Sequence, residues 1–107
     1  MDLQTELWET YELLKKATAE LKQRGIEYHK AQRNYRVKLA KKELELRTEN
    51  YPATLISDLA RGNEEVADAK LQEGITKTLY ESCQEGINVY KYGLKILQEQ
   101  INKEYEG

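Results

Sequence analysis

Apolar and small residues recur through the first half of the chain at spacings of three, four or seven. The recurring positions are Leu3, Leu7, Leu14, Ala17, Leu21, Gly25, Tyr28, Tyr35, Leu39 and Leu46. This spacing places them on one stripe of an amphipathic helix, and the positions seven apart from Leu7 to Tyr35 keep a heptad register. The pattern predicts a helix over residues 3–49, with Thr5 as a cap for a slightly later start.

The first break in this pattern is the segment Asn50-Tyr51-Pro52-Ala53. Proline has no backbone N–H and disfavours the helical conformation in the residue before it, so the first helix must end here. We expect an elbow over residues 50–63 that contains a short helix, residues 55–61. Thr54 is its predicted N-cap, and Gly62 is expected to end it in the left-handed conformation.

A second amphipathic pattern begins after Asn63, the expected N-cap of a helix over residues 64–105 with Glu64 and Glu65 in its first turn. Its predicted stripe is Val66, Leu71, Ile75, Leu79, Cys83, Gly86, Tyr90, Leu94, Leu97 and Ile101. Gly74, Gly86 and Gly93 are unfavourable in an isolated helix, so we expect tertiary contacts to offset them. The spacing of seven between Gly86 and Gly93 favours close approach of a neighbouring backbone, and Gly25 suggests the same for the first helix.

These elements predict an all-α fold in which residues 1–107 form a single domain. Two long antiparallel helices would pair as a coiled-coil-like hairpin, with the short helix at the elbow. Residues 1–49 carry a net charge of +2 and residues 63–107 a net charge of −4, so the two long helices are electrically complementary. A lone hairpin would leave further apolar positions exposed: Ile26, Val37, Leu44, Ile87, Val89 and Ile96. Self-association into a dimer or higher helical bundle is therefore expected.

Candidate catalytic and metal-binding residues are scarce in this sequence. The single histidine, His29, and the single cysteine, Cys83, have no partner at a metal-ligand spacing. We interpret His29 as a solvated residue and Cys83 as a small buried apolar residue. Pairs of glutamates are better explained as solvated helix neighbours than as an acid–base pair, and no known catalytic motif is present. We therefore expect no enzymatic activity, no metal and no cofactor.

A basic segment is the first candidate for function. Residues 28–42 contain six lysine or arginine residues and no acid. At 100° per residue, Lys30, Arg33, Lys38 and Lys41 lie on the face opposite to the apolar stripe. These four residues are candidates for contact with the phosphates of a nucleic acid. The alternative is a solvated face that pairs with the acidic second helix or with a partner subunit.

The elbow and the acidic second helix hold the candidate protein-binding residues. Leu55, Ile56 and Leu59 either fold back onto the hairpin or dock into a partner, oriented by Asp58 and Arg61. In the second helix, Glu81, Glu85 and Glu99 are candidates for contact with a basic partner surface.

Several segments of the chain resemble small proteins encoded by phages and prophages of low-GC Gram-positive bacteria. The segments are residues 6–8 (ELW), 34–36 (NYR), 43–47 (ELELR), 51–62 (YPATLISDLARG), 64–67 (EEVA) and 87–90 (INVY). That group tends to lie in early gene regions with replication and recombination proteins. The resemblance implies a phage origin and an accessory role, and it transfers no catalytic or binding residue.

The sequence thus favours a non-enzymatic phage accessory protein that binds another phage or host protein. It would act in replication or recombination, or inhibit a host defence nuclease such as a CRISPR effector. The alternatives are a nucleic-acid-binding protein and a purely structural dimer. No signal peptide and no apolar run of membrane-spanning length is present, so we expect no membrane contact and a location in the cytoplasm of the bacterial host.

Overall fold

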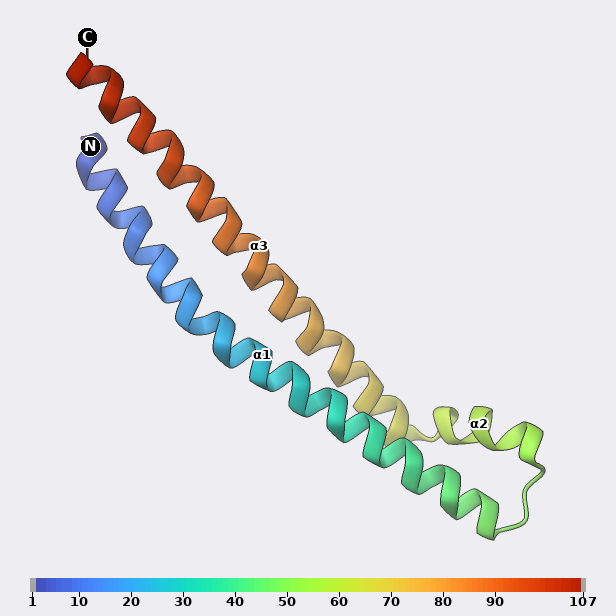
Figure 1. The fold of residues 1–107 in the computed structure, drawn as a ribbon. Coiled ribbons are helices and arrows are strands. Elements are labelled where there is room, and N and C mark those ends of the chain that lie inside the picture. The colour runs from blue at the N-terminus through green and yellow to red at the C-terminus, as the bar shows by residue number, and fades with distance from the viewer. Residues whose placement is uncertain (1, 107) are drawn as a thin grey trace. The chain divides into compact units, whose positions relative to one another are not determined.

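The computed structural model describes residues 2–106, and within them it is all-α (Figure 1). The helices are α1 (Leu3–Thr48), α2 (Ala53–Gly62) and α3 (Glu64–Glu106), and no strand occurs in this range. The two long helices pack against each other in antiparallel orientation, with α2 between them in the chain. The predicted fold class is confirmed.

The chain divides into two compact units. The terminal unit comprises the described residues of Met1–Arg24 and Tyr80–Gly107, and the elbow unit comprises Gly25–Leu79. Each unit therefore contains part of α1 and part of α3, and the elbow unit also contains all of α2.

The start of α1 differs from the prediction. The carboxylate of Asp2 accepts a hydrogen bond of 2.7 Å from the backbone N–H of Thr5, and the helix begins at Leu3. Thr5 as the cap was wrong, because the acid three residues earlier already satisfies the Thr5 N–H, which has no partner within the helix.

The elbow begins at Asn50, whose φ of 66° lies in the left-handed region that asparagine tolerates better than most residues. Pro52 then directly precedes α2 and serves as its N-cap, without a side-chain hydrogen bond. Thr54 as the N-cap was wrong, because α2 starts at Ala53 and Thr54 already lies in its first turn.

Asn63 both ends α2 and begins α3. Its backbone is extended, with φ −64° and ψ 133°, and its side-chain oxygen accepts a hydrogen bond of 3.2 Å from the Val66 N–H. The predicted cap is confirmed, and so are Glu64 and Glu65 in the first turn. Gly62 as a left-handed stop was wrong, since no glycine in the described residues has positive φ. The extended conformation that an N-cap requires already interrupts the helix at the next residue.

The core of the elbow unit is small and joins α1 to α2. Leu46, Ile56 and Ala60 are buried, and the half-buried Leu39 packs against them. Ile56 and Ala60 are four residues apart, so they share one face of α2. The predicted apolar stripe of α1 is half-buried along its length and fully buried at Leu46.

The predicted stripe of α3 is buried at Val66 and Ile101 and half-buried from Cys83 to Leu97, but the prediction was wrong for residues 71–79. Leu71, Ile75 and Leu79 are exposed by 62%, 45% and 40%, whereas Val66, Ala69 and Thr76 are buried. The Thr76 hydroxyl donates to the backbone oxygens of Gln72 (2.9 Å) and Glu73 (3.0 Å), which removes the cost of burying it. In the elbow unit α3 therefore turns small side chains inward and large apolar ones outward.

In the terminal unit, Ile87 is buried although it was expected at the surface. The other predicted exposed positions, Ile26, Val37, Leu44, Val89 and Ile96, are exposed. Cys83 is half-buried and its thiol donates to the backbone oxygen of Ala17 at 3.4 Å.

The expected close approach at the glycines of α3 was wrong. A Cβ placed on Gly74 or Gly86 would meet nothing within 4 Å, and one on Gly93 would make only an ordinary contact with Thr10 Cγ2 at 3.8 Å. No neighbouring backbone therefore requires glycine at these three positions.

Candidate functional site

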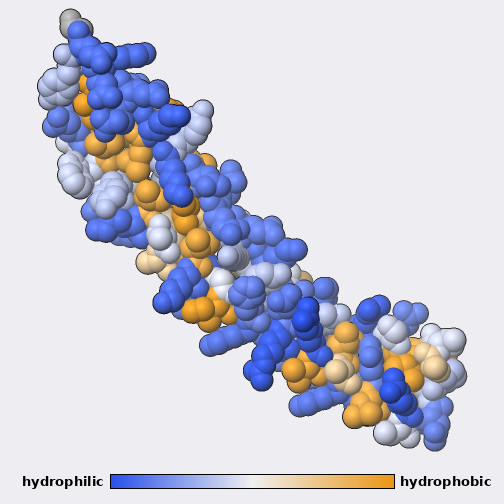
Figure 2. All heavy atoms as spheres, in the orientation of Figure 1, coloured by the Kyte–Doolittle hydropathy of each residue, from blue (hydrophilic) through white to orange (hydrophobic). Residues whose placement is uncertain are grey.

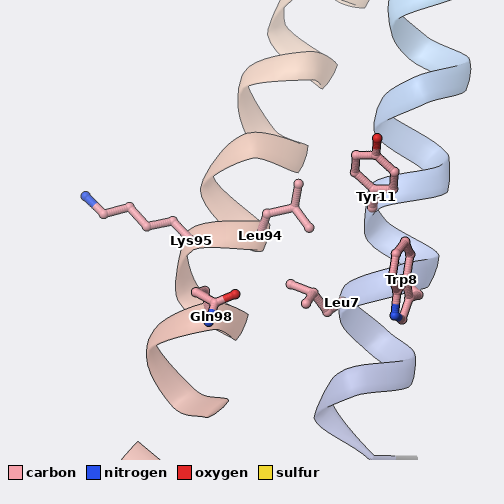
Figure 3. A pocket seen from close by; sticks show the side chains of 6 residues that line it. All are labelled: Leu7, Trp8, Tyr11, Leu94, Lys95 and Gln98. Carbon is pink, nitrogen blue, oxygen red and sulfur yellow. The ribbon is translucent and has the colours of Figure 1, made fainter. Parts of the chain in front are cut away.

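The terminal unit contains a hollow lined on one side by α1 and on the other by α3 (Figure 3). We call it the aromatic hollow, and its volume is about 570 Å³. The residues that line it are Leu7, Trp8, Tyr11, Leu94, Lys95 and Gln98. Leu7 and Leu94 extend toward each other across it, whereas the side chain of Lys95 extends away from α1.

The aromatic side of this hollow is pre-arranged. The rings of Trp8 and Tyr11 meet edge to face, with centroids 5.8 Å apart and an interplanar angle of 81°. This geometry is favourable for aromatic pairs because the positive edge of one ring meets the negative face of the other. The ammonium of Lys15 lies 5.6 Å from the centre of the Tyr11 ring and adds a cation–π contact. Trp8 is nevertheless 64% exposed.

The sequence prediction missed this site. The signal was the position of the only tryptophan, three residues before a tyrosine on the same helix. Residues i and i+3 are neighbours on a helix surface, and both lie beside the apolar stripe through Leu7 and Leu14. The part that α3 contributes could not be found, because it depends on how the two helices are paired.

A second apolar surface lies on α3 in the elbow unit. Leu71, Ile75 and Leu79 line a shallow groove together with Ala67, Lys70, Gly74 and Thr78. We name Ala67, Leu71, Gly74, Ile75, Thr78 and Leu79 the α3 face. Figure 2 shows hydrophobic residues reaching the molecular surface between hydrophilic ones in several places. The α3 face is therefore one of several apolar patches that the fold of one chain leaves uncovered.

The four basic candidates do not share one environment. Lys30, Arg33 and Lys41 are exposed, whereas Lys38 is half-buried and its ammonium lies 3.4 Å from the carboxylate of Glu65. Lys38 therefore pairs with the acidic α3. The alternative interpretation of the basic segment predicted such pairing for all four candidates.

Lys42 and His29 lie close to these basic candidates in the sequence. Lys41 lies beside Lys42, which pairs with Glu45 at 3.4 Å, and both lysines line a small hollow at the start of α3. The exposed His29 stacks on Tyr28, with ring centroids 5.2 Å apart.

The elbow candidates separate into an inner and an outer group. Ile56 is buried in the core of the elbow unit and is not accessible to a partner. Leu55 and Leu59 are exposed by 48% and 42%, and Asp58 and Arg61 are also exposed.

The acidic candidates lie together on α3 in the terminal unit. Glu81, Glu85 and Glu99 are all exposed, and at 100° per residue they fall within about 40° of one another around the helix. They form one acidic edge that a basic partner can contact.

Residues 2–106 contain no group of three histidine, cysteine or acidic side chains placed to hold a metal ion. Within the same range, no helix has a stretch long and apolar enough to cross a membrane. Asp2 has a pKa lowered from its ordinary value, chiefly because its carboxylate accepts the Thr5 backbone N–H.

Comparison with protein-family models, curated proteins and solved structures finds no match to this chain.

Proposed function

We propose that this chain is a non-enzymatic protein-binding protein and that the aromatic hollow is its contact with another protein. The observation that carries the proposal is the exposure of Trp8 beside Tyr11 at the rim of an apolar hollow. Tryptophan and tyrosine dominate the binding energy of protein interfaces, because each buries a large rigid surface at little cost in side-chain entropy.

The residues that line the hollow indicate which kind of partner surface would fit it. Leu7 and Leu94 form apolar walls that fit an aliphatic or aromatic side chain. Lys95 lines the hollow on α3, and the ammonium of Lys15 lies over the Tyr11 ring on α1. An amphipathic helix that presents one apolar anchor and a neighbouring acid meets both requirements. Because the hollow is already formed in the free chain, binding requires little reorganisation.

For its biological role, we propose a phage accessory protein that acts in replication or recombination or occludes a host defence nuclease. The support is the resemblance of residues 43–67 to phage proteins, together with the exposed edge of Glu81, Glu85 and Glu99. An acidic helical edge can occupy a basic channel that otherwise holds nucleic acid. The cytoplasm of the bacterial host is the corresponding location.

The test is affinity purification of the tagged chain from phage-infected cells, with Trp8→Ala and the control Tyr92→Ala. Tyr92 is also an exposed aromatic residue of the terminal unit, at 69%, and does not line the hollow. We expect a partner that co-purifies with the wild type and the control and is reduced at least about tenfold with Trp8→Ala. Equal recovery with Trp8→Ala would contradict the assignment of the hollow.

The acidic edge needs its own variant. Changing Glu81, Glu85 and Glu99 to lysine reverses its charge and leaves the hollow intact. If the partner protein binds the acidic edge through its nucleic-acid channel, the triple variant no longer binds the partner. The partner can then bind nucleic acid again. Retained binding by the triple variant would exclude the occlusion mechanism and leave the role in replication or recombination.

Nucleic-acid binding is the second candidate, favoured by the exposure of Lys30, Arg33 and Lys41 in a segment without acids. It predicts an affinity that falls steeply with salt concentration. A gel-shift assay at low salt, with Lys30→Glu, Arg33→Glu and Lys41→Glu combined, tests it. Absence of a shift, or an equal shift with this variant, rules it out.

We also propose that the chain associates with itself. The support is a set of large apolar side chains left partly exposed on α3, including Leu71 (62%), Ile75 (45%) and Leu79 (40%). Burial of such side chains against a second copy removes them from water at about 25 cal/mol per Å².

A further inference from the structure

We infer that the α3 face binds the same face of a second copy, with the two α3 helices antiparallel about a twofold axis near Ile75. This inference rests on the proposed self-association and assigns it a surface and a geometry. It does not involve the aromatic hollow, which lies in the terminal unit.

The first argument is the direction in which α3 turns its apolar residues. Leu71, Ile75 and Leu79 follow one another at intervals of four and fall within about 80° around the helix. The buried residues Val66, Ala69 and Thr76 lie on a different side, centred about 130° away. Three large aliphatic side chains on consecutive turns are therefore only partly covered by the fold of a single chain, with exposures of 62%, 45% and 40%.

The second argument is the exposed area of the chain. Its accessible surface is 8096 Å². A compact monomer of 12.5 kDa would expose about 6,200 Å². The excess, about 1,900 Å², is more than twice the roughly 800 Å² that each partner buries in a standard stable interface. After burying an interface of ordinary size, each chain would still expose at least as much surface as a compact monomer of its mass.

The third argument is that the α3 face is its own complement. A twofold axis through Ile75 places Leu71 of one copy opposite Leu79 of the other, and Ile75 opposite Ile75, as an isologous interface requires. Gly74 lies about 100° from Ile75 around the helix, at one edge of the α3 face, and nothing comes within 4 Å of the place where its Cβ would be. Ala67 and Thr78 lie on the same edge as Gly74, and these small residues leave room beside the paired large side chains of the two copies.

Asp68 decides between the antiparallel and the parallel orientation. It is exposed and lies only about 20° from Ile75 around the helix. Parallel helices in register would place Asp68 against Asp68, where like charges repel each other. The antiparallel arrangement separates the two carboxylates by about 20 Å along the helix, at 1.5 Å per residue.

The first experiment measures the molecular mass of the full chain in solution by light scattering over a range of concentrations. We expect a dimer for the wild type and a monomer for Ile75→Glu, while the control Leu44→Glu remains dimeric. Circular dichroism confirms that each variant is helical, which is expected because both positions are exposed. A wild type that stays monomeric at all concentrations overturns the proposed self-association altogether. A dimer that survives Ile75→Glu, or is lost with Leu44→Glu, overturns only the assignment to the α3 face.

The second experiment tests the orientation by cysteine cross-linking after mild oxidation, with Cys83 changed to serine in every variant. Ile75→Cys is expected to form a disulfide-linked dimer. Leu71→Cys alone is expected to form none, whereas a mixture of Leu71→Cys and Leu79→Cys chains is expected to cross-link. In the antiparallel dimer the two positions 71 lie about 12 Å apart along the axis, beyond the roughly 7 Å Cα separation that a disulfide spans. Efficient cross-linking of Leu71→Cys to itself would establish a parallel pair and overturn the inference.

Discussion

The ammonium of Lys38 lies 3.4 Å from the carboxylate of Glu65 and links α1 to the first turn of α3 within the elbow unit. The lysine side chain is 36% exposed and the glutamate side chain 74% exposed. The pair therefore joins two elements far apart in the sequence, in surroundings that solvent screens strongly.

The first prediction is that this exposed ion pair contributes little to stability. A double-mutant cycle with Lys38→Ala and Glu65→Ala, followed by urea denaturation, is expected to give a coupling free energy of at most about 1 kcal/mol. Adding salt to 1 M should remove most of it, because the Debye length falls to about 3 Å. A coupling that is larger and independent of salt would show that the pair is far less solvated than its exposure indicates.

The second prediction concerns Asn63, which caps α3. Asn63→Ala removes the acceptor of the Val66 N–H and is expected to lower the free energy of unfolding by about 1 kcal/mol. Asn63→Asp keeps the acceptor and should be close to the wild type. The control Asn34→Ala, at an exposed position inside α1, should be neutral or slightly stabilising because alanine has the higher helix propensity. Equal losses at both asparagines would argue against a capping role.

The third prediction separates the two sides of α2. Ile56→Ala opens a cavity beside Leu46 and Ala60 and is expected to destabilise the chain by about 2–4 kcal/mol. Leu55→Ala removes a side chain that is 48% exposed and should cost less than about 1 kcal/mol. Thermal and urea unfolding of both variants measure the difference. The order would be reversed if α2 packed through its Leu55 side instead.

The fourth prediction follows from the open space around Gly86. Alanine at this position meets nothing within 4 Å and should stabilise α3 by about 0.5–1 kcal/mol, since glycine loses more backbone entropy on folding. Hydrogen exchange of α3 amides and the free energy of unfolding report the gain. Destabilisation by Gly86→Ala would indicate that a neighbouring backbone, from this chain or from a second copy, contacts the glycine.

The fifth prediction concerns pH. The pKa of Asp2 is lowered from its ordinary value of 3.8, chiefly by the Thr5 backbone hydrogen bond. The ionised carboxylate is therefore favoured in the folded state, and its stabilising effect on the start of α1 is fully present above pH 3.8. It is lost as the pH falls through the lower pKa of the folded state. NMR titration of the Asp2 carboxyl should give a value below 3.8, and Asp2→Ala should increase amide exchange in the first turn at neutral pH, with an effect that shrinks as the Asp2 carboxylate of the wild type becomes protonated.

The fold could be predicted to a large extent because its determinants are local. Proline at position 52 ends α1 whatever surrounds it, and the Asn63 side chain reaches the N–H groups of its own helix. The stripe of α1 was also predictable, since its positions recur at spacings of three, four or seven and so share one face of the helix.

The candidate site was less accessible to sequence reasoning. Trp8 and Tyr11 are neighbours through helix geometry alone, but Leu94, Lys95 and Gln98 join them only because of the register of α3 against α1. Lys38 likewise belongs to the basic segment by sequence and becomes the partner of Glu65 only through tertiary packing.

The amino-acid sequence by itself determined that this protein consists of long helices, where they break, and which face of α1 turns inward, because these properties depend on residues within a few turns. Only the tertiary structure decided which side of α3 is buried over residues 69–79. Two apolar stripes compete on that helix, and the stripe with Ala69 and Thr76 packs inward, which leaves Leu71, Ile75 and Leu79 in contact with solvent. A prediction from side-chain size and helix spacing chose the larger residues as the buried ones. The outcome depends on packing against elements that lie far away along the chain.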